Sequence, residues 1–220
     1  MLDLLLPQRC LVCSVPGPQV CERCTAELKR LGPPWCIRCG APTSWPIGRC
    51  AECADRRVSF ARARAAVEYD APVRRIVGAW KERGLRRLAA WAASVVVDSL
   101  ERPEADCLTF VPAHRERRLE RGHHPAEALA RDLAAGWGLG HEPLLFRVRG
   151  SPRQRELGRT ERRRNVVKAF AAAEAAPARV VLVDDVYTTG STANAAASAL
   201  RKAGAEAVEV ITFARAIRTC

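Results

Sequence analysis

Val180-Val-Leu-Val-Asp-Asp-Val-Tyr-Thr-Thr-Gly-Ser-Thr192 is the stretch of sequence that decides the fold of this chain. It begins with four consecutive apolar residues, the pattern of a strand that is buried on both faces of a parallel sheet. Two carboxylates, Asp184 and Asp185, follow where this strand is expected to end. A glycine turn then opens into an Ala-rich helix over 193–203, which Gly204 ends.

The loop between this strand and this helix is rich in hydroxyl groups. Its residues are Thr188, Thr189, Gly190, Ser191 and Thr192. A loop that leads onto a helix N-terminus leaves backbone N–H groups without intrahelical partners, and such groups bind anions. The acidic pair alone also fits a Mg²⁺ site or a helix N-cap in another kind of α/β protein. The chain has no GxxxxGK[ST] or GxGxxG motif, which disfavours nucleoside triphosphate and dinucleotide binding.

Strands and helices alternate through the rest of the chain from 62 to 214. Strands are predicted at 62–69, 106–112 and 207–214, and helices at 72–83, 85–100 and 125–137. This alternation predicts an α/β domain with a mainly parallel sheet flanked by helices, and the first strand reads as an edge strand. Ligands of such sheets bind beyond the carboxyl ends of the strands. Val111, Pro112 and the acidic pair are expected to meet there.

The cysteines predict zinc. Eight of the ten form four CxxC pairs, Cys10/Cys13, Cys21/Cys24, Cys36/Cys39 and Cys50/Cys53. Two CxxC turns together complete the tetrahedral thiolate shell of structural zinc. Sequential pairing gives one site over 10–24 and another over 36–53, and crossed pairing between the two halves is the alternative. Redox activity is disfavoured because the four pairs lie outside any βαβ pattern.

The cysteine-rich segment has few aliphatic residues, so metal binding is expected to supply its folding free energy. It can serve as a structural clip or hold nucleic acid directly, and the clip is favoured. Trp35 and Trp45 are able to stack on bases. Covering the small core beside the metal is the more common role for such aromatic residues.

Charged residues suggest a lid and an anionic partner. Arginine dominates the stretch from 147 to 164, where no hydrophobic period is visible, and this predicts a mobile loop that can contain a short helix near 158–166. Long loops of this kind are either functional lids or disordered segments. His123 and His124 precede Pro125, which suggests an exposed turn before a helix rather than a metal site. A net charge of +12 favours phosphorylated or polyanionic partners, and a solvated basic surface is the alternative.

Nothing in the composition indicates a membrane or a secreted protein. No apolar run approaches the roughly 18 residues of a membrane span, and the first seven residues lack the basic start of a secretory signal. We therefore expect a cytoplasmic protein without membrane insertion. An apolar content of 48% in 220 residues is enough for one ordinary domain with a small appendage.

The stretch over 180–192 resembles the 5-phosphoribosyl-1-pyrophosphate (PRPP) signature of type I phosphoribosyltransferases. The surrounding motifs are similar to those of the ComF branch, the competence-associated proteins with an N-terminal zinc ribbon. The matching positions are Lys81, Val111-Pro112, Arg121-Gly122, Gln154 to Leu157 and Arg162 to Asn165. The resemblance covers nearly the whole chain. It departs at His123-His124-Pro125, where Phe-Asn and a polar residue are usual.

The resemblance implies a domain division and a role for each motif. It implies a double zinc ribbon over 1–55 and a phosphoribosyltransferase-like domain over 60–220, with a basic flexible loop over 147–166. Asp184 and Asp185 would hold the ribose hydroxyls, and the loop over 188–192 would hold the 5-phosphate. The implied catalytic residues are Asp184, Asp185, Lys81 and Arg115. Val111 and Pro112 are implied to bind PRPP together with the acidic pair and the loop over 188–192. The basic loop over 147–166 would close over the site and contribute Gln154, Arg162 and Asn165.

Two functions follow from the resemblance. The first is a phosphoribosyltransferase of unknown acceptor that uses PRPP with Mg²⁺ and is linked to DNA uptake, natural competence or DNA metabolism. The second is an uptake factor that binds single-stranded DNA and keeps the PRPP site as a sensor or relic without turnover. PRPP, single-stranded DNA and other competence proteins are the implied partners.

Overall fold

The computed structural model describes residues 8–113, 123–148 and 169–217. Its centre is a five-stranded sheet in the order β1-β7-β6-β2-β3, and every pair of neighbours in it is parallel. The strands are β1 Arg62–Glu68, β2 Cys107–Phe110, β3 Gly140–His141, β6 Arg179–Tyr187 and β7 Ala207–Arg215. A separate antiparallel pair joins β4 Leu145–Arg147 to β5 Phe170–Ala172. The expected mainly parallel sheet is confirmed.

Strand β6 lies between β7 and β2, as its unbroken apolar run predicts. Its pairing with β2 ends at Val183, opposite Phe110. The prediction that the strand ends before Asp184 was wrong, because the longer β7 continues the ladder as far as Tyr187. The acidic pair therefore lies beyond the end of β2 while β7 still holds it in an extended conformation.

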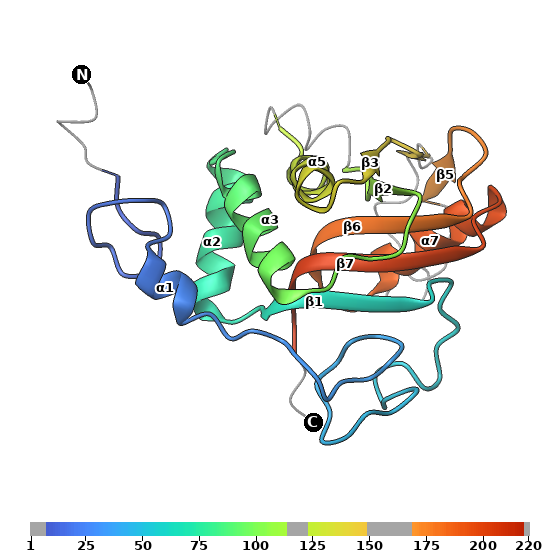
Figure 1. Cartoon of the computed structure of the whole chain (residues 1–220), viewed down its shortest axis with the longest axis horizontal. Helices are drawn as coiled ribbons and strands as arrows, with labels where there is room; N and C mark the ends of the chain where they lie inside the picture. The colour runs from blue at the N-terminus through green and yellow to red at the C-terminus, as the bar shows by residue number, and fades with distance from the viewer. Residues whose placement is uncertain (1–7, 114–122, 149–168, 218–220) are drawn as a thin grey trace, which may run out of the picture.

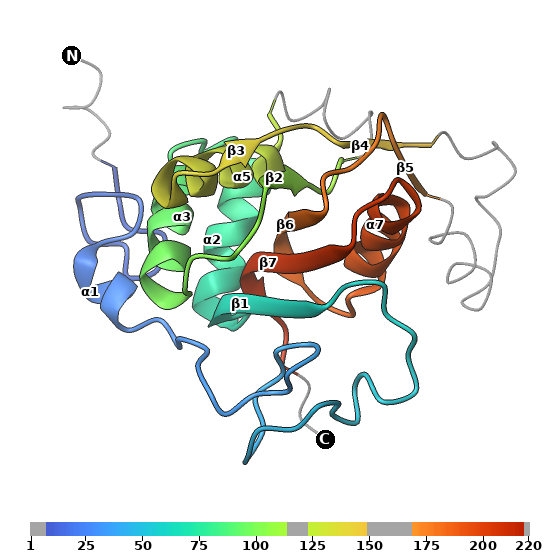
Figure 2. The ribbon, with the colours of Figure 1, turned by 45° about the vertical axis from the view of Figure 1, so that its right-hand side comes forward.

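Helices cover both faces of the sheet. They are α2 Ala71–Glu82, α3 Leu88–Ser99, α5 Pro125–Trp137 and α7 Ser191–Lys202. One apolar cluster joins α2, α3 and α5 to Val181 and Val183 of β6, and a second joins α7 to Leu182. Successive residues of a strand point to opposite faces, so α7 lies on the face opposite the other three helices (Figures 1 and 2).

Two helix boundaries show how local chemistry limits prediction. Helix α2 ends before Gly84, whose φ of +66° suits glycine, as expected. Helix α3 begins at Leu88 rather than at the predicted residue 85, because a turn occupies the intervening residues.

Trp80 is fully buried, and Trp91 packs against Phe213 with ring centroids 5.4 Å apart. Trp80 thus belongs to the apolar core, and Trp91 packs against it.

The cysteine-rich segment covers the free edge of β1. The amide of Leu31 donates to the Ala66 carbonyl at 2.9 Å, and the amide of Ala63 donates to the Arg38 carbonyl at 2.9 Å. Exposed strand edges are prone to wrong pairing unless they are covered. β1 is therefore an edge strand, as predicted, and the ribbon protects it (Figure 1). Among the described residues no helix is long and apolar enough to cross a membrane.

Candidate functional site

A cavity of about 400 Å³ opens at the carboxyl edge of the sheet, between β2, β6, α2 and α5. Seven residues that the sequence singled out line it: Lys81, Val111, Pro112, Asp184, Asp185, Thr188 and Thr192. Its other walls include Tyr69, Ala113, His124, Pro125, Ala126, Arg147 and Val186. Residues from six separate segments thus meet where parallel sheets usually bind ligands.

The acidic pair and Lys81 form the charged centre of this cavity. Lys81 lies in the last turn of α2, and its Nζ is 2.7 Å from Oδ1 of Asp185. Both side chains are mostly buried, with 27% of the Lys81 side chain and 14% of the Asp185 side chain exposed. Asp184 Oδ1 accepts a hydrogen bond from the Asp185 amide at 2.9 Å. The expectation that Lys81 reaches the site is supported by this ion pair.

Asp184 lies where its charge is unfavourable. Desolvation of its carboxyl group, and after it the charge of Asp185, raises the pKa of Asp184 to about 8. Lys81 acts in the opposite direction. Without a ligand, burial and the neighbouring carboxylate therefore favour the protonated form of Asp184. Because protonated Asp184 is an O–H donor as well as an acceptor, it is suited to hydrogen-bond a sugar hydroxyl.

Asp184→Asn is expected to stabilise the ligand-free protein by about 1–3 kcal/mol above pH 8, with little change near pH 4. The folded-state pKa lies above the unfolded value of about 3.9. The folded state therefore binds more protons, and the free energy of unfolding falls as the pH rises from about 4 to 8. Asparagine does not ionise, so it removes this slope. Urea unfolding across this pH range tests the prediction, and parallel curves for wild type and variant would contradict it.

The hydroxyl-rich loop forms a small recess beside the cavity. The recess measures about 20 Å³, and its walls include Asp184, Thr188, Gly190, Ser191, Thr192 and Thr212. Helix α7 begins here with Gly190 as its N-cap, which makes no side-chain cap hydrogen bond. Of the first-turn amides, that of Ser191 donates to Thr189 Oγ1 at 3.3 Å. The first-turn N–H groups and the helix dipole therefore favour an anion at this place. Because Asp184 lines both spaces, it joins the recess to the cavity.

Gly190 is required by the close approach of Tyr187. Its φ is +70°, and a Cβ atom at this position would lie 2.1 Å from the Tyr187 hydroxyl oxygen. We expect Gly190→Ala to destabilise the protein by about 2–4 kcal/mol, from backbone strain together with overpacking. Gly138→Ala is the matched control, because Gly138 has a φ of +62° but no atom within 4 Å of such a Cβ. Urea unfolding measures both variants, and an equal loss of unfolding free energy in Gly190→Ala and Gly138→Ala would contradict the prediction.

His124 departs from the sequence prediction of an exposed turn. Its exposed fraction is 8%, and its ring packs edge-on to Phe110 with centroids 5.0 Å apart. The ring Nε2 lies 2.7 Å from the Ala113 amide, and Nδ1 lies 3.2 Å from the Glu127 amide. A neutral imidazole accepts a hydrogen bond at only one of its two nitrogens. His124 therefore accepts from either the Ala113 amide or the Glu127 amide at any one time. His124 thus joins the segment after β2 to the first turn of α5.

Several predicted site residues lie outside the described residues. These are Arg115, Gln154, Arg162 and Asn165, together with most of the predicted loop over 147–166. Arg147, where that loop begins, is described and lines the cavity. Its guanidinium carbon lies 4.7 Å from the centre of the Phe170 ring, and its Nε is 3.5 Å from the Pro112 carbonyl. The basic segment therefore starts at the mouth of the site.

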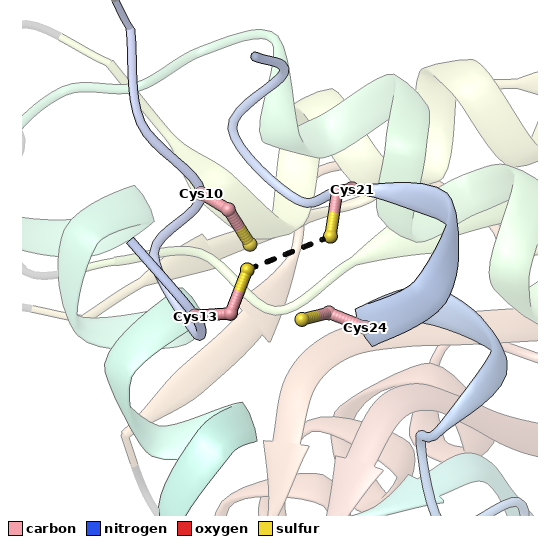
Figure 3. A group of neighbouring side chains, drawn as sticks. All are labelled: Cys10, Cys13, Cys21 and Cys24. Carbon is pink, nitrogen blue, oxygen red and sulfur yellow. Dashed lines mark hydrogen bonds between the residues drawn. The ribbon is translucent and has the colours of Figure 1, made fainter. Parts of the chain in front are cut away.

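The cysteines form two separate four-sulfur clusters, one over Cys10 to Cys24 and the other over Cys36 to Cys53. The sequential pairing is thus the one that the fold adopts. Figure 3 shows the four side chains of the first cluster pointing toward a common centre. The sulfur atoms lie 3.7 Å apart in the pair Cys13 and Cys21, and 3.4 to 3.9 Å apart in three pairs of the second cluster. Tetrahedral zinc with bonds of about 2.3 Å needs sulfurs about 3.8 Å apart, so both clusters fit zinc.

Comparison with known proteins identifies the family. Residues 1–56 match the model of the double zinc ribbon domain, and residues 119–219 match that of the phosphoribosyl transferase domain. The chain is 30% identical to Competence protein F of Haemophilus influenzae in an alignment of length 211 that covers 90% of each chain. The chain belongs to the competence protein F (ComF) family. Both the double zinc ribbon and the phosphoribosyltransferase-like fold are thereby confirmed.

Other relatives of this ComF protein extend over similar lengths. DNA utilization protein YhgH of Salmonella typhi is 28% identical over 97% of this chain and 100% of its own. Competence protein ComFC of Bacillus subtilis is 27% identical over 93% of this chain and 87% of its own. Among solved structures, the glutamine PRPP amidotransferase of B. subtilis complexed with ADP and GMP is 25% identical, with a TM-score of 0.38. The alignment covers 57% of this chain and 25% of that enzyme. The division of the ComF chain at residues 55–60 stays a prediction.

Proposed function

We propose that this protein binds PRPP with Mg²⁺ at the cavity and acts as a phosphoribosyltransferase-like protein linked to DNA uptake or DNA metabolism. The observation that carries the proposal is the meeting of the acidic pair, Lys81 and the α7 N-terminus in one connected space. Two of its relatives carry the names Competence protein F and DNA utilization protein, and these support the link to DNA.

Each part of the site suits one part of PRPP. The recess at the start of α7 would hold the 5-phosphate, because its N–H and hydroxyl groups converge there. Asp184 and Asp185 would accept hydrogen bonds from the ribose hydroxyls in the adjoining cavity. Ala113 and Arg147, which line the cavity, would face the pyrophosphate. Bound Mg²⁺ would neutralise charge on that leaving group.

The proposed reaction breaks the bond between C1 of the ribose and the pyrophosphate oxygen. The electron pair leaves with pyrophosphate, and an acceptor nucleophile forms the new bond at C1 through an oxocarbenium-like transition state. Burial of Lys81 and Asp185 indicates that this part of the cavity is poorly hydrated, which protects such a cation from water. Pyrophosphate release in the presence of a broad panel of bases tests turnover separately from binding.

Binding of single-stranded DNA is a second candidate function. A groove of about 380 Å³ lies between Leu11 of the first ribbon and the outer face of α2, and Arg74, Arg75 and Arg83 line it beside a single acid, Glu82. Such a basic groove suits a phosphate backbone.

The two tryptophans of the second ribbon differ in their surroundings. Trp45 has an exposed fraction of 67% and so does not cover the small core as expected. The guanidinium carbon of Arg64 lies 4.6 Å from the centre of the Trp35 ring.

Binding of oligonucleotides by this surface is expected to weaken steeply with salt. Arg74→Gln with Arg75→Gln should reduce the slope of log affinity against log salt by about 1–2. Asp184→Asn is the matched control and should leave that slope unchanged, because it lies in the other cavity. Absence of binding at low salt, or an unchanged slope in the arginine variant, would contradict this second function.

A further inference from the structure

The segment that follows the second cysteine cluster runs along the hydroxyl-rich loop over 188–192, although about 135 residues separate the two in sequence. Because this loop is assigned to the 5-phosphate, it is called the phosphate loop below. Arg56, three residues after Cys53, donates from Nη1 to the Thr189 carbonyl at 2.5 Å, and its Nη2 is 3.5 Å from Ser191 Oγ. Farther along, the Ser59 amide donates to Asn194 Oδ1 of α7 at 2.6 Å. The segment directly after the second cysteine cluster is therefore in contact with this loop and with α7.

The contact of Arg56 fixes the direction of one peptide group. In a trans peptide the C=O and the following N–H point to opposite sides. Because the Thr189 carbonyl is turned toward Arg56, the Gly190 N–H points away from it. Gly190 also lines the recess beside Asp184. Arg56 thus holds the loop in the conformation in which its backbone donors can converge on an anion.

A second arginine connects the same cysteine cluster to the base of the loop. Arg215 has an exposed fraction of 1%, and it donates to the Cys39 carbonyl at 2.6 Å and to Glu52 Oε2 at 2.7 Å. Its guanidinium carbon lies 4.6 Å from the centre of the ring of Tyr187, the residue just before the loop. Loss of the metal would release both partners and leave a buried cation poorly compensated.

The first cysteine cluster is built into a different part of the fold. Its segment contacts α3, where Trp91 Nε1 donates to Thr25 at 3.2 Å and Arg30 donates to the Val95 carbonyl at 2.8 Å. It supports the helices on the far face of the sheet from α7. The two clusters therefore have separate supporting roles, and the first serves as an internal control for the second.

We propose that Arg56 is a positioning residue of the phosphate loop, and that the second four-cysteine site with its metal holds Arg56 in place. This inference rests on the proposed function, because it assigns the loop to the 5-phosphate of PRPP. It makes the second ribbon site part of the binding site rather than only a cover for the edge of β1. Affinity for PRPP therefore depends on the metal content of that site.

Arg56→Gln and Arg57→Gln are the variants that test this proposal. They remove the same charge one residue apart, and Arg57 is exposed. Arg56→Gln should speed hydrogen exchange in a peptide covering 187–192 and weaken PRPP binding about 10- to 100-fold. Arg57→Gln should change neither, and Arg56→Lys should restore part of the affinity. If Arg56→Gln and Arg57→Gln exchange and bind alike, the proposal is wrong.

The role of the metal is tested with one cysteine variant from each cluster, Cys50→Ser and Cys13→Ser. Each should lose one zinc ion per chain by native mass spectrometry, and only Cys50→Ser should speed exchange over 187–192. Equal loop exchange in the two variants would overturn the metal dependence. If Cys50→Ser does not fold, the Arg56 pair still decides the proposal. A wild type that fails to bind PRPP would refute the proposed function, whereas hydrogen exchange would still test the contact itself.

Discussion

Cys24→Ser is expected to release one zinc ion per chain and to lower the melting temperature by roughly 10 °C or more. Cys24 is 3% exposed and belongs to the main apolar cluster together with Val20 and Leu28. Structural zinc contributes about 10–16 kcal/mol to the folding of zinc-finger peptides, which is comparable to the total stability of a domain. Loss of the first site would therefore disturb α3 as well as the ribbon.

Cys107→Ser is the matched control for this prediction. Cys107 is also 3% exposed, but it lies in β2 and belongs to neither cysteine cluster. Burying a serine hydroxyl in place of its thiol should cost about 1–3 kcal/mol and leave the zinc content unchanged. Metal analysis and calorimetric melting distinguish the two variants. A Cys24→Ser protein that keeps two zinc ions and melts like Cys107→Ser would contradict the structural role of the first site.

Asp185→Asn is expected to weaken the binding of Mg²⁺-PRPP by about 100-fold or more. The change removes a carboxylate that would accept from the ribose hydroxyls. It also leaves the mostly buried Lys81 ammonium without the partner that lies 2.7 Å away. A charged hydrogen bond contributes about 1.5–3 kcal/mol, and the upper end of this range corresponds to about 100-fold in affinity. Isothermal titration calorimetry measures the change.

Asp106→Asn is the control that separates this effect from a general loss of charge. Asp106 makes an ion pair of 2.9 Å with Arg179, immediately before the first residue of β2 and so at the amino edge of the sheet. The control breaks a comparable pair far from the cavity and should leave the dissociation constant of PRPP within about twofold. Equal losses of affinity in the two variants would show that the site does not depend on Asp185 specifically.

The sequence predicted those parts of the molecule that depend on local patterns. The apolar run before Asp184 identified the central strand, because such a run is typical of a strand buried on both faces. The CxxC spacing identified both zinc sites, since two thiolates of one turn must face one metal. Two glycines with a positive φ also marked helix boundaries: Gly84 follows the end of α2, and Gly190 precedes the first residue of α7.

Long-range contacts could not be predicted in the same way. Lys81 and Asp185 are separated by 104 residues, and Arg56 and Thr189 by 133, so no local period connects them. The resemblance to ComF motifs pointed to Lys81 but not to Arg56. His124 was misjudged because two adjacent histidines before a proline look exposed, whereas the fold buries the second one against Phe110. Burial of a polar ring depends on tertiary partners that lie elsewhere in the sequence.

Binding of Mg²⁺-PRPP to the wild type and to the Asp184→Asn/Asp185→Asn double variant tests the proposed site most directly. Calorimetry should show saturable binding at one site per chain in the wild type and no measurable heat of binding in the double variant. Urea unfolding of the double variant should confirm that it is folded. Equal binding by both proteins, or no binding by the wild type at millimolar ligand, would contradict the assignment of this cavity to PRPP.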